Sequence, residues 1–267
     1  MGDVFKKRAT PHEIATEAAS LRWLAAADGI AVVPLEEVDI AAGWLTTTRI
    51  TPTAATKKLA YEAGIGLAHT HAAGAPHFGA PPPTLTTPGR FAGITLPMSE
   101  DVCSWGEFYA RDRCLPYLHI ARDAGALTQA QTRRCERVIA RIAADEFTSP
   151  LPQACRQARV RAARTHGDLW GGNLMWGHLA TEPTSVRGWL IDPAAHGGHA
   201  ETDLAALALF GSPYLTDLIA GYQSVSPLSS QWQARVGIHQ FHMLLVHAAL
   251  FGGGYGAHVS AVAQQYC

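Results

Sequence analysis

A short polar loop, His166-Gly-Asp-Leu-Trp-Gly-Gly-Asn173, constrains this chain more than any other stretch of its sequence. Asp168 and Asn173 stand close enough together for one turn to fix their side chains relative to one another. An apolar run then ends in Asp192, and a short hairpin would return this residue to the loop. We therefore expect a fold that holds three oxygen-bearing side chains together beside a pair of strands.

The pattern H-x-D-x-x-x-x-N, followed by a later aspartate, has the spacing of a kinase catalytic loop and its second metal-binding carboxylate. Asp168 fits the base that orients an attacking hydroxyl and accepts its proton. Asn173 and Asp192 fit ligands of Mg²⁺, which prefers oxygen donors. The alternative is a polar loop with caps and turns between a helix and a strand. The combination of all three residues favours the kinase-like interpretation.

The same residues resemble the fructosamine kinases, also called ketosamine 3-kinases. HGDLWGGN and the segment IDPAAHGGHAETDLAALALFG, which contains Asp192, are similar to that family, which usually has Ser where this chain has Gly172. The resemblance extends to Trp105–Tyr109 and to LLVHAALFGGGYG near the C-terminus. It covers most of residues 100–266 and residues 1–75 only loosely.

This resemblance implies an α+β, bilobal protein-kinase-like fold of the aminoglycoside-phosphotransferase type. We expect a truncated N-terminal β-sheet lobe over residues 1–50, on the nucleotide side. A mainly helical C-terminal lobe over residues 51–267 would carry the catalytic loop and the metal site. The run Phe251–Gly256 predicts a helix end or close helix packing rather than a nucleotide loop.

The resemblance places the nucleotide-contacting lysine at Lys7, in an expected strand over residues 4–8. Lys6 is the alternative, because neighbours in a strand point to opposite faces. A helix that starts at Thr10-Pro11 would carry Glu17 on its inward side, where a carboxylate needs a cation such as Lys7. Otherwise Glu17 lies at the edge of the apolar stripe and reaches water.

The stretch from Gly43 to Ile50 predicts a strand and resembles the segment that leads into a kinase hinge, where adenine meets the backbone. The expected ATP-binding residues there are Thr47, Thr48 and Arg49. Kinases also cover the triphosphate with a strand–turn–strand ahead of the lysine strand. Only six residues precede Lys7. We therefore expect this cover to be missing, through either a start site placed too late or a real loss.

On the acceptor side, Trp170 is the expected sugar platform, because an indole face stacks on a sugar ring; core packing is the alternative. The resemblance implies that His196, His199 and Glu201 lie in a loop that lines the sugar-binding side. The Gly-Gly turn between the two histidines and the oxygen-ligand context argue against zinc there. Asp203 is expected either to cap the next helix or to tether the catalytic loop.

Other segments are expected to form the scaffold around the site. A helix is expected from Thr51-Pro52 to about His71, and residues 74–101 predict an extended surface loop, either a substrate-side flap or inert packing. A helix that begins at Ser104 should bend or break at Pro116. Four arginines ahead of the catalytic loop predict a solvated basic face, with an anion contact as the alternative: Arg156, Arg159, Arg161 and Arg164.

Composition narrows the class of protein. The net charge of −1 gives no electrostatic case for nucleic acid or an anionic membrane. No apolar run reaches membrane length, and the first residues lack a signal-peptide core. The five cysteines form no C-x-x-C pair, which predicts reduced thiols. We therefore expect a cytoplasmic protein.

The functional expectation is transfer of the ATP γ-phosphoryl group, with Mg²⁺, to a sugar hydroxyl of ketosamines such as fructosamine or ribulosamine. The partners implied are sugar-amine adducts on small amines or protein lysines, and the process is deglycation. One alternative keeps the fold and changes the acceptor to an aminoglycoside or choline. Another is a pseudokinase that binds without turnover because the nucleotide cover is missing.

Overall fold

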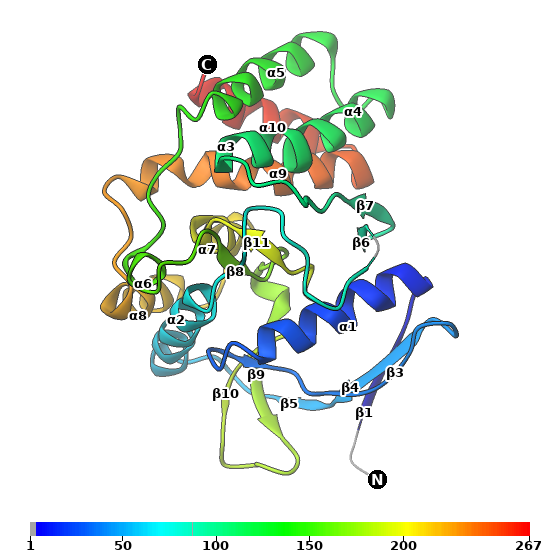
Figure 1. Ribbon diagram of the computed structural model, residues 1–267, viewed down its shortest axis with the longest axis vertical. Helices are drawn as coiled ribbons and strands as arrows, with labels where there is room; N and C mark the ends of the chain where they lie inside the picture. The colour runs from blue at the N-terminus through cyan, green and yellow to red at the C-terminus, as the bar shows by residue number, and fades with distance from the viewer. Residues whose placement is uncertain (1–3, 87) are drawn as a thin grey trace.

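The computed structural model describes residues 4–86 and 88–267. It combines small β-sheets with many helices, and the two larger sheets lie at one end of the molecule while a helical bundle occupies the other (Figure 1). One apolar core lies between the sheets and the helices next to them, and a second fills the bundle. Within the described residues, no helix is both long and apolar enough to cross a lipid bilayer.

The first sheet has the strand order β1-β4-β3. Its strands, all antiparallel, are β1 (Val4–Arg8), β4 (Trp44–Thr48) and β3 (Leu35–Asp39). Helix α1 (Pro11–Ala25) packs against it and begins with the expected capping box between Thr10 and Glu13. Its inward face is apolar, as predicted, and is fully buried at Ile14 and Leu24.

The second sheet has the strand order β2-β10-β9-β5. Its strands are β2 (Ala31–Val32), β10 (Arg187–Leu190), β9 (Leu174–Leu179) and β5 (Ile50–Pro52). The antiparallel hairpin β9–β10 confirms the predicted return of the chain towards the catalytic loop. The sheet joins strands from both sides of residue 50, so hydrogen bonds connect the two expected lobes, and the boundary there stays a prediction.

Helix α2 (Lys57–Ala72) starts later than predicted, with Thr56 as its N-cap. Thr51 and Pro52 belong to strand β5 instead, because Ile50 and its neighbours pair with β9. A proline is tolerated there because β5 is the edge strand of its sheet.

Helix α2 packs along α8 (Leu215–Val225) at very short range. A Cβ on Gly64 of α2 would lie 1.9 Å from the Leu218 carbonyl oxygen, and one on Gly221 of α8 would lie 1.9 Å from the Tyr61 carbonyl oxygen. Each helix therefore uses a glycine to let the other backbone approach.

The Pro/Gly-rich residues 74–101 are not only loop. They contain the antiparallel hairpin β6 (Gly89–Phe91) and β7 (Ile94–Leu96), which the sequence prediction missed. The strands are short, and contacts with α1 fix their place in the fold. This hairpin lies between α1 and the helical bundle (Figure 1).

The bundle is built on α9 (Trp232–Phe251), which packs against α4 (Leu115–Asp123) and α10 (Gly254–Gln265). Its other members are α3 (Trp105–Phe108), the π-helix η1 (Tyr109–Cys114) and α5 (Gln129–Ala143). Pro116 lies in the first turn of α4, directly after the π-helix, so the predicted irregularity is present. Gly252 caps α9, which confirms the predicted helix end.

Arg164 does not belong to a solvated basic face. Its guanidinium donates to the carbonyl oxygens of Trp23 (2.8 Å) and Gly74 (3.2 Å) and lies over the Trp23 ring. It therefore links α1 to the chain that follows α2. The short helix α6 (Gln153–Gln157) precedes this region, and all five cysteines are free thiols, as expected.

Candidate active site

The catalytic loop begins where strand β8 (Ala163–Thr165) ends, and β8 pairs with β11 (His196–Gly198). Asp203, in helix α7 (Ala200–Leu209), accepts hydrogen bonds from the backbone N–H of His166 (2.7 Å) and of Gly167 (3.1 Å). It also lies 3.1 Å from the His71 ring. Asp203 is buried, so it fixes the start of the loop from inside the protein, as one of the two sequence alternatives predicted.

Asp168 and Asn173 meet as the sequence predicts. The Asn173 Nδ2 group donates to Asp168 Oδ2 at 2.9 Å and to the Asp168 carbonyl oxygen at 2.8 Å, across the 3₁₀ turn η2 (Gly171–Asn173). Both side chains are mostly buried, and burial raises the pKa of Asp168 to about 7, although Asn173 opposes this rise. A carboxyl group in this state suits proton exchange near neutral pH.

The β9–β10 hairpin brings Asp192 to the same place. The backbone N–H of Ile191 donates to the Asn173 carbonyl oxygen at 3.1 Å, so the two segments run side by side. Asp192 has a positive φ of 52°, a left-handed conformation that Asp tolerates better than most residues. Its side chain lines the same cavity as those of Asp168 and Asn173.

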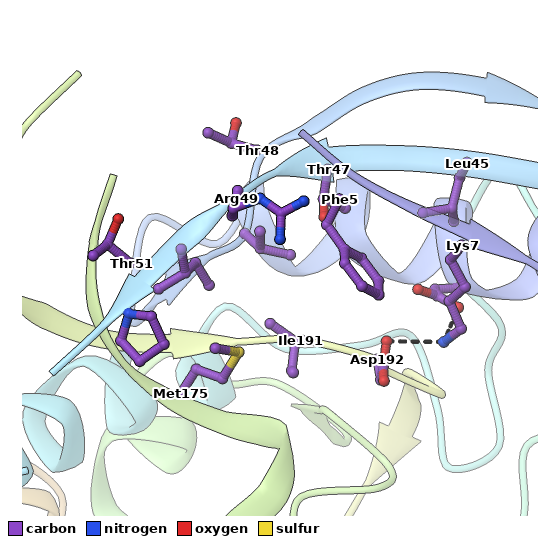
Figure 2. Close-up of a pocket in the computed structure, with 14 residues that line it drawn as sticks. Phe5, Lys7, Leu45, Thr47, Thr48, Arg49, Thr51, Met175, Ile191 and Asp192 are labelled. Atoms are coloured by element: carbon purple, nitrogen blue, oxygen red, sulfur yellow. Dashed lines mark hydrogen bonds and ion pairs between the residues drawn. The ribbon is translucent and has the colours of Figure 1, made fainter. Parts of the chain in front are cut away.

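Lys7 connects this group to α1. Its Nζ atom lies 2.8 Å from Asp192 Oδ1 and 2.7 Å from Glu17 Oε2, and Figure 2 shows the lysine reaching down to Asp192. Lys6 lies over the Trp44 ring at 3.8 Å instead, so the strand presents only Lys7 to the site. Burial lowers the pKa of the Lys7 ammonium, but the two carboxylates outweigh burial and raise it overall.

Two cavities meet at Lys7, Glu17 and Asp192. The first, of about 470 Å³, extends from these charges along β4 and β5, and the expected residues Thr47, Thr48 and Arg49 line it. Sequence reasoning missed its apolar walls, which are Phe5, Val33, Leu45, Ile50, Met175 and Ile191 (Figure 2). A cavity with an apolar body and a charged end can hold a flat base at one end and phosphates at the other.

The sequence holds part of the information needed to predict these apolar residues. Met175 stands two residues after Asn173 at the start of β9, and residues two apart in a strand share a face. Ile191 directly precedes Asp192, just after β10 ends. Phe5 stands two residues before Lys7 and therefore points to the same side of β1.

The second cavity, of about 340 Å³, contains Asp168, Asn173 and Trp170. Trp170 is 40% exposed, and its indole meets Phe210 edge to face at 6.1 Å. The alternative that it packs into the core is therefore wrong. Glu13, which was not predicted, completes this cavity together with the tip of the β6–β7 hairpin, which belongs to the segment that the sequence offered as a substrate-side flap. We call it the acceptor cavity below.

His196, His199 and Glu201 lie elsewhere. Each is at most 5% exposed, and none is among the residues that line either cavity. His196 packs against Phe108, while Glu201 forms a 2.7 Å ion pair with Arg235. The structure therefore does not bring these three side chains to the acceptor side. Their partners come from distant segments, which the local pattern could not reveal.

His199 and Glu201 come together with His239 in a buried cluster whose ligand atoms all lie within 4.8 Å of one another. The expectation that no zinc binds there stays a prediction. The His199 Nδ1 atom accepts the backbone N–H of Glu201 at 3.2 Å, so its Nε2 atom carries the proton and faces the Ser149 carbonyl oxygen. Burial lowers the pKa of His199 to about 3, in keeping with a neutral ring. The Arg235 guanidinium already occupies the Glu201 carboxylate.

The fold places this chain among proteins with a protein-kinase-like fold. The choline kinase LicA from Streptococcus pneumoniae shares the fold, with a TM-score of 0.58 and 15% identity over 98% of this chain and 84% of that one. The gentamicin complex of APH(2'')-IIa gives the same score at 10% identity, covering 98% of this chain and 87% of that one. The expected fold class is thereby confirmed.

Residues 4–267 match the family model described as Fructosamine kinase, and the chain belongs to that family. A crystal structure from Thermobifida fusca YX-ER1, provisionally assigned as a fructosamine-3-kinase, has a TM-score of 0.85 and 36% identity, covering 98% of this chain and 85% of that one. The family resemblance is therefore confirmed.

Two curated relatives also have names of ketoamine or ketosamine kinases. A provisionally assigned ketoamine kinase of Enterococcus faecium is 25% identical over 203 residues, which are 75% of this chain. The ketosamine-3-kinase of Mus musculus is 29% identical over 156 residues, which are 57% of this chain. The matches span 64% of the Enterococcus protein and 43% of the mouse protein, so this chain covers about half of the curated relatives' length.

Proposed function

We propose that this protein transfers the γ-phosphoryl group of ATP to a sugar hydroxyl of ketosamines, such as the 3-hydroxyl of fructosamine or ribulosamine. The supporting observation is the meeting of Asp168 with Asn173, 2.9 Å apart, and with the Lys7–Asp192 pair at the junction of two cavities. Loss of the phosphorylated adduct would then remove the sugar from the amine, and the process would be deglycation. The free thiols are consistent with a cytoplasmic location.

The residues present fit ATP with Mg²⁺. Asn173 uses its amide nitrogen to hold Asp168, so its side-chain oxygen stays available, and Asp192 adds a carboxylate. These oxygen donors suit Mg²⁺, which would neutralise phosphate charge when bound. Lys7, positioned by Glu17, would contact phosphate oxygens, and the first cavity would hold the base beside Thr47, Thr48 and Arg49. The related fold of APH(2'')-Ib has been solved with ADP.

Asp168 would act as the base in the acceptor cavity. Its carboxylate would orient the sugar hydroxyl towards the phosphate and accept the proton as the new bond forms. Trp170, two residues further on and exposed to the same cavity, would stack on the sugar ring. His196, His199 and Glu201 would support the loop that follows Asp192 rather than touch the acceptor.

An acceptor panel tests this proposal. With MgATP we expect phosphate transfer to fructosyl-lysine and ribulosyl-lysine, with the phosphate on the 3-hydroxyl by NMR, and little transfer to choline or an aminoglycoside. Transfer only to choline or an aminoglycoside would show that the acceptor class is wrong. Binding of ATP without transfer to any acceptor would favour a non-catalytic protein, although the intact Asp168, Asn173 and Asp192 argue against that outcome.

A further inference from the structure

The β6–β7 hairpin forms one wall of the acceptor cavity and is held rigidly. Its turn residues Ala92 and Gly93 both have positive φ angles, 48° and 80°, as in the tight two-residue turns that match the twist of paired strands. The Arg90 backbone N–H donates to Thr16 Oγ1 at 3.0 Å, and the Gly93 N–H donates to Glu13 Oε1 at 2.8 Å. Helix α1 therefore fixes the tip of the hairpin.

The far end of the hairpin is fixed to the helical bundle. The Tyr117 hydroxyl donates to the Thr95 carbonyl oxygen at 2.9 Å, and the buried Arg113 guanidinium donates to the Pro97 carbonyl oxygen at 2.5 Å. Hydrogen bonds to α1 and to the helical bundle therefore hold the backbone of the hairpin that bears the β6 side chains. Such a side chain can recognise a ligand at a small cost in entropy.

Arg90 is the cation that this wall presents. Of the residues that the structure describes, two cations line the acceptor cavity, Lys7 and Arg90, and Lys7 is already paired with Glu17 and Asp192. The Arg90 guanidinium donates to the Gly93 carbonyl oxygen at 2.6 Å. Hydrogen bonds lower the pKa of Glu13 and the Arg90 charge adds to this, but no hydrogen bond joins the two side chains among the described residues. The bond to Gly93 uses one of the several N–H groups of Arg90. The cavity therefore holds a guanidinium with donors to spare.

The hydrogen bonds that the structure shows for the Glu13 carboxylate on α1 come from other donors. Glu13 accepts hydrogen bonds from the Thr10 N–H at 3.1 Å, the Thr10 hydroxyl at 2.6 Å and the Gly93 N–H at 2.8 Å. Its oxygens are therefore occupied by the helix cap and by the hairpin turn. An anionic group that enters the cavity could therefore accept hydrogen bonds from the remaining N–H groups of the planar Arg90 fork.

We propose that Arg90 binds a carboxylate of the acceptor. The preferred acceptors would then be ketosamines formed on the α-amine of an amino acid, because their carboxylate stands next to the substituted amine. An adduct on a lysine side chain within a protein has no such carboxylate at that position. This inference rests on the proposed function and adds a class of substrate to it.

The test compares two acceptors that differ in this group alone, the fructose adducts of glycine and of glycinamide. We expect wild type to favour the acid over the amide in kcat/KM by about 10- to 100-fold, the usual effect of one charge-assisted hydrogen-bonded pair. Arg90→Gln should remove that preference by raising KM for the acid, with kcat and the amide almost unchanged. Arg90→Lys should keep part of it. Arg133→Gln, an exposed arginine on α5, is the matched control and should behave as wild type.

Equal use of the acid and the amide by wild type would overturn the role of Arg90 and leave the proposed function standing. A preference for the acid that survives in Arg90→Gln would overturn it as well, because another group would then bind the carboxylate. If neither adduct is phosphorylated, while ATP still binds, the proposed function fails and this inference fails with it. Continued use of the amide by Arg90→Gln shows that the variant remains folded.

Discussion

At the scale of single residues, Gly172 sets the position of the indole that faces the acceptor cavity. A Cβ at residue 172 would lie 2.3 Å from the Trp170 Cη2 atom, so the ring lies directly over the glycine. The fructosamine kinases that this chain resembles usually have a serine at this position. The Trp170 ring therefore occupies a position that the side chain of a serine at residue 172 would block.

We expect Gly172→Ser to move the Trp170 ring and to break its edge-to-face contact with Phe210. Because the backbone of the loop is held by Asp203, the indole should rotate while the loop keeps its place. A crystal structure of the variant, together with a change of several-fold in KM for the acceptor, would show this. An unmoved indole and an unchanged KM would contradict it.

Lys7 and Lys6 offer a matched pair of neighbouring lysines. Lys7→Gln leaves Glu17 and Asp192 without their shared cation, so we expect KM for ATP to rise by on the order of tenfold or more. Lys6→Gln removes only a contact with the Trp44 ring on the other face of the strand and should leave KM nearly unchanged. Equal effects of the two substitutions in steady-state kinetics would refute the assignment of Lys7.

At the scale of elements, helix α7 supports the catalytic loop through one buried carboxylate. Asp203→Ala leaves the N–H groups of His166 and Gly167 without acceptors, which should lower the free energy of unfolding by about 2–5 kcal/mol. Turnover should fall as well, because Asp168 follows these residues directly. Asp203→Asn keeps one oxygen and should be intermediate. Urea denaturation of both variants measures this, and wild-type stability of Asp203→Ala would contradict it.

Local patterns predicted the elements that local chemistry decides. The loop from Asp168 to Asn173, the hairpin back to Asp192 and the capped start of α1 are all short-range features, and the structure has them. The predicted start of α2 was wrong because Thr51 and Pro52 have the sequence of a helix cap followed by a proline in the first turn. Their pairing with β9, more than a hundred residues later, decides the matter.

Long-range contacts explain the remaining differences. The β6–β7 hairpin depends on Glu13 and Thr16 of a distant helix, so its strand pattern alone is too short to detect. The segment with His199 and Glu201 can be buried because Arg235 supplies the compensating charge. No residue near position 201 indicates that Arg235 is its partner. Such pairs cannot be inferred from spacing.

At the scale of the whole molecule, buried neutral histidines make the fold sensitive to acid. Burial, aided by Arg113, lowers the pKa of His242 to about 3, whereas an unfolded histidine titrates near 6.5. The unfolded chain therefore takes up a proton as the pH falls below about 6.5, and the folded protein does not. Stability is complete above this pH and is lost progressively between about 6.5 and 3.

This one histidine should lower the free energy of unfolding by about 1.4 kcal/mol at pH 5.5 relative to pH 8. His242→Gln should show a smaller difference between these pH values than wild type in urea denaturation. His119→Gln, at an exposed position on α4, is the control and should keep the wild-type difference. An unchanged difference in His242→Gln would exclude this residue as a cause of the acid sensitivity.

The proposed phosphoryl transfer depends most on Asp168 as the base between the nucleotide cavity and the acceptor cavity. The most direct measurement is magnesium-dependent transfer of the ATP γ-phosphoryl group to fructosyl-lysine by wild type and by Asp168→Asn. We predict that kcat falls by about 10²–10⁴-fold in the variant, while its thermal unfolding stays close to that of wild type. Turnover at the wild-type rate by a folded Asp168→Asn protein would contradict the account.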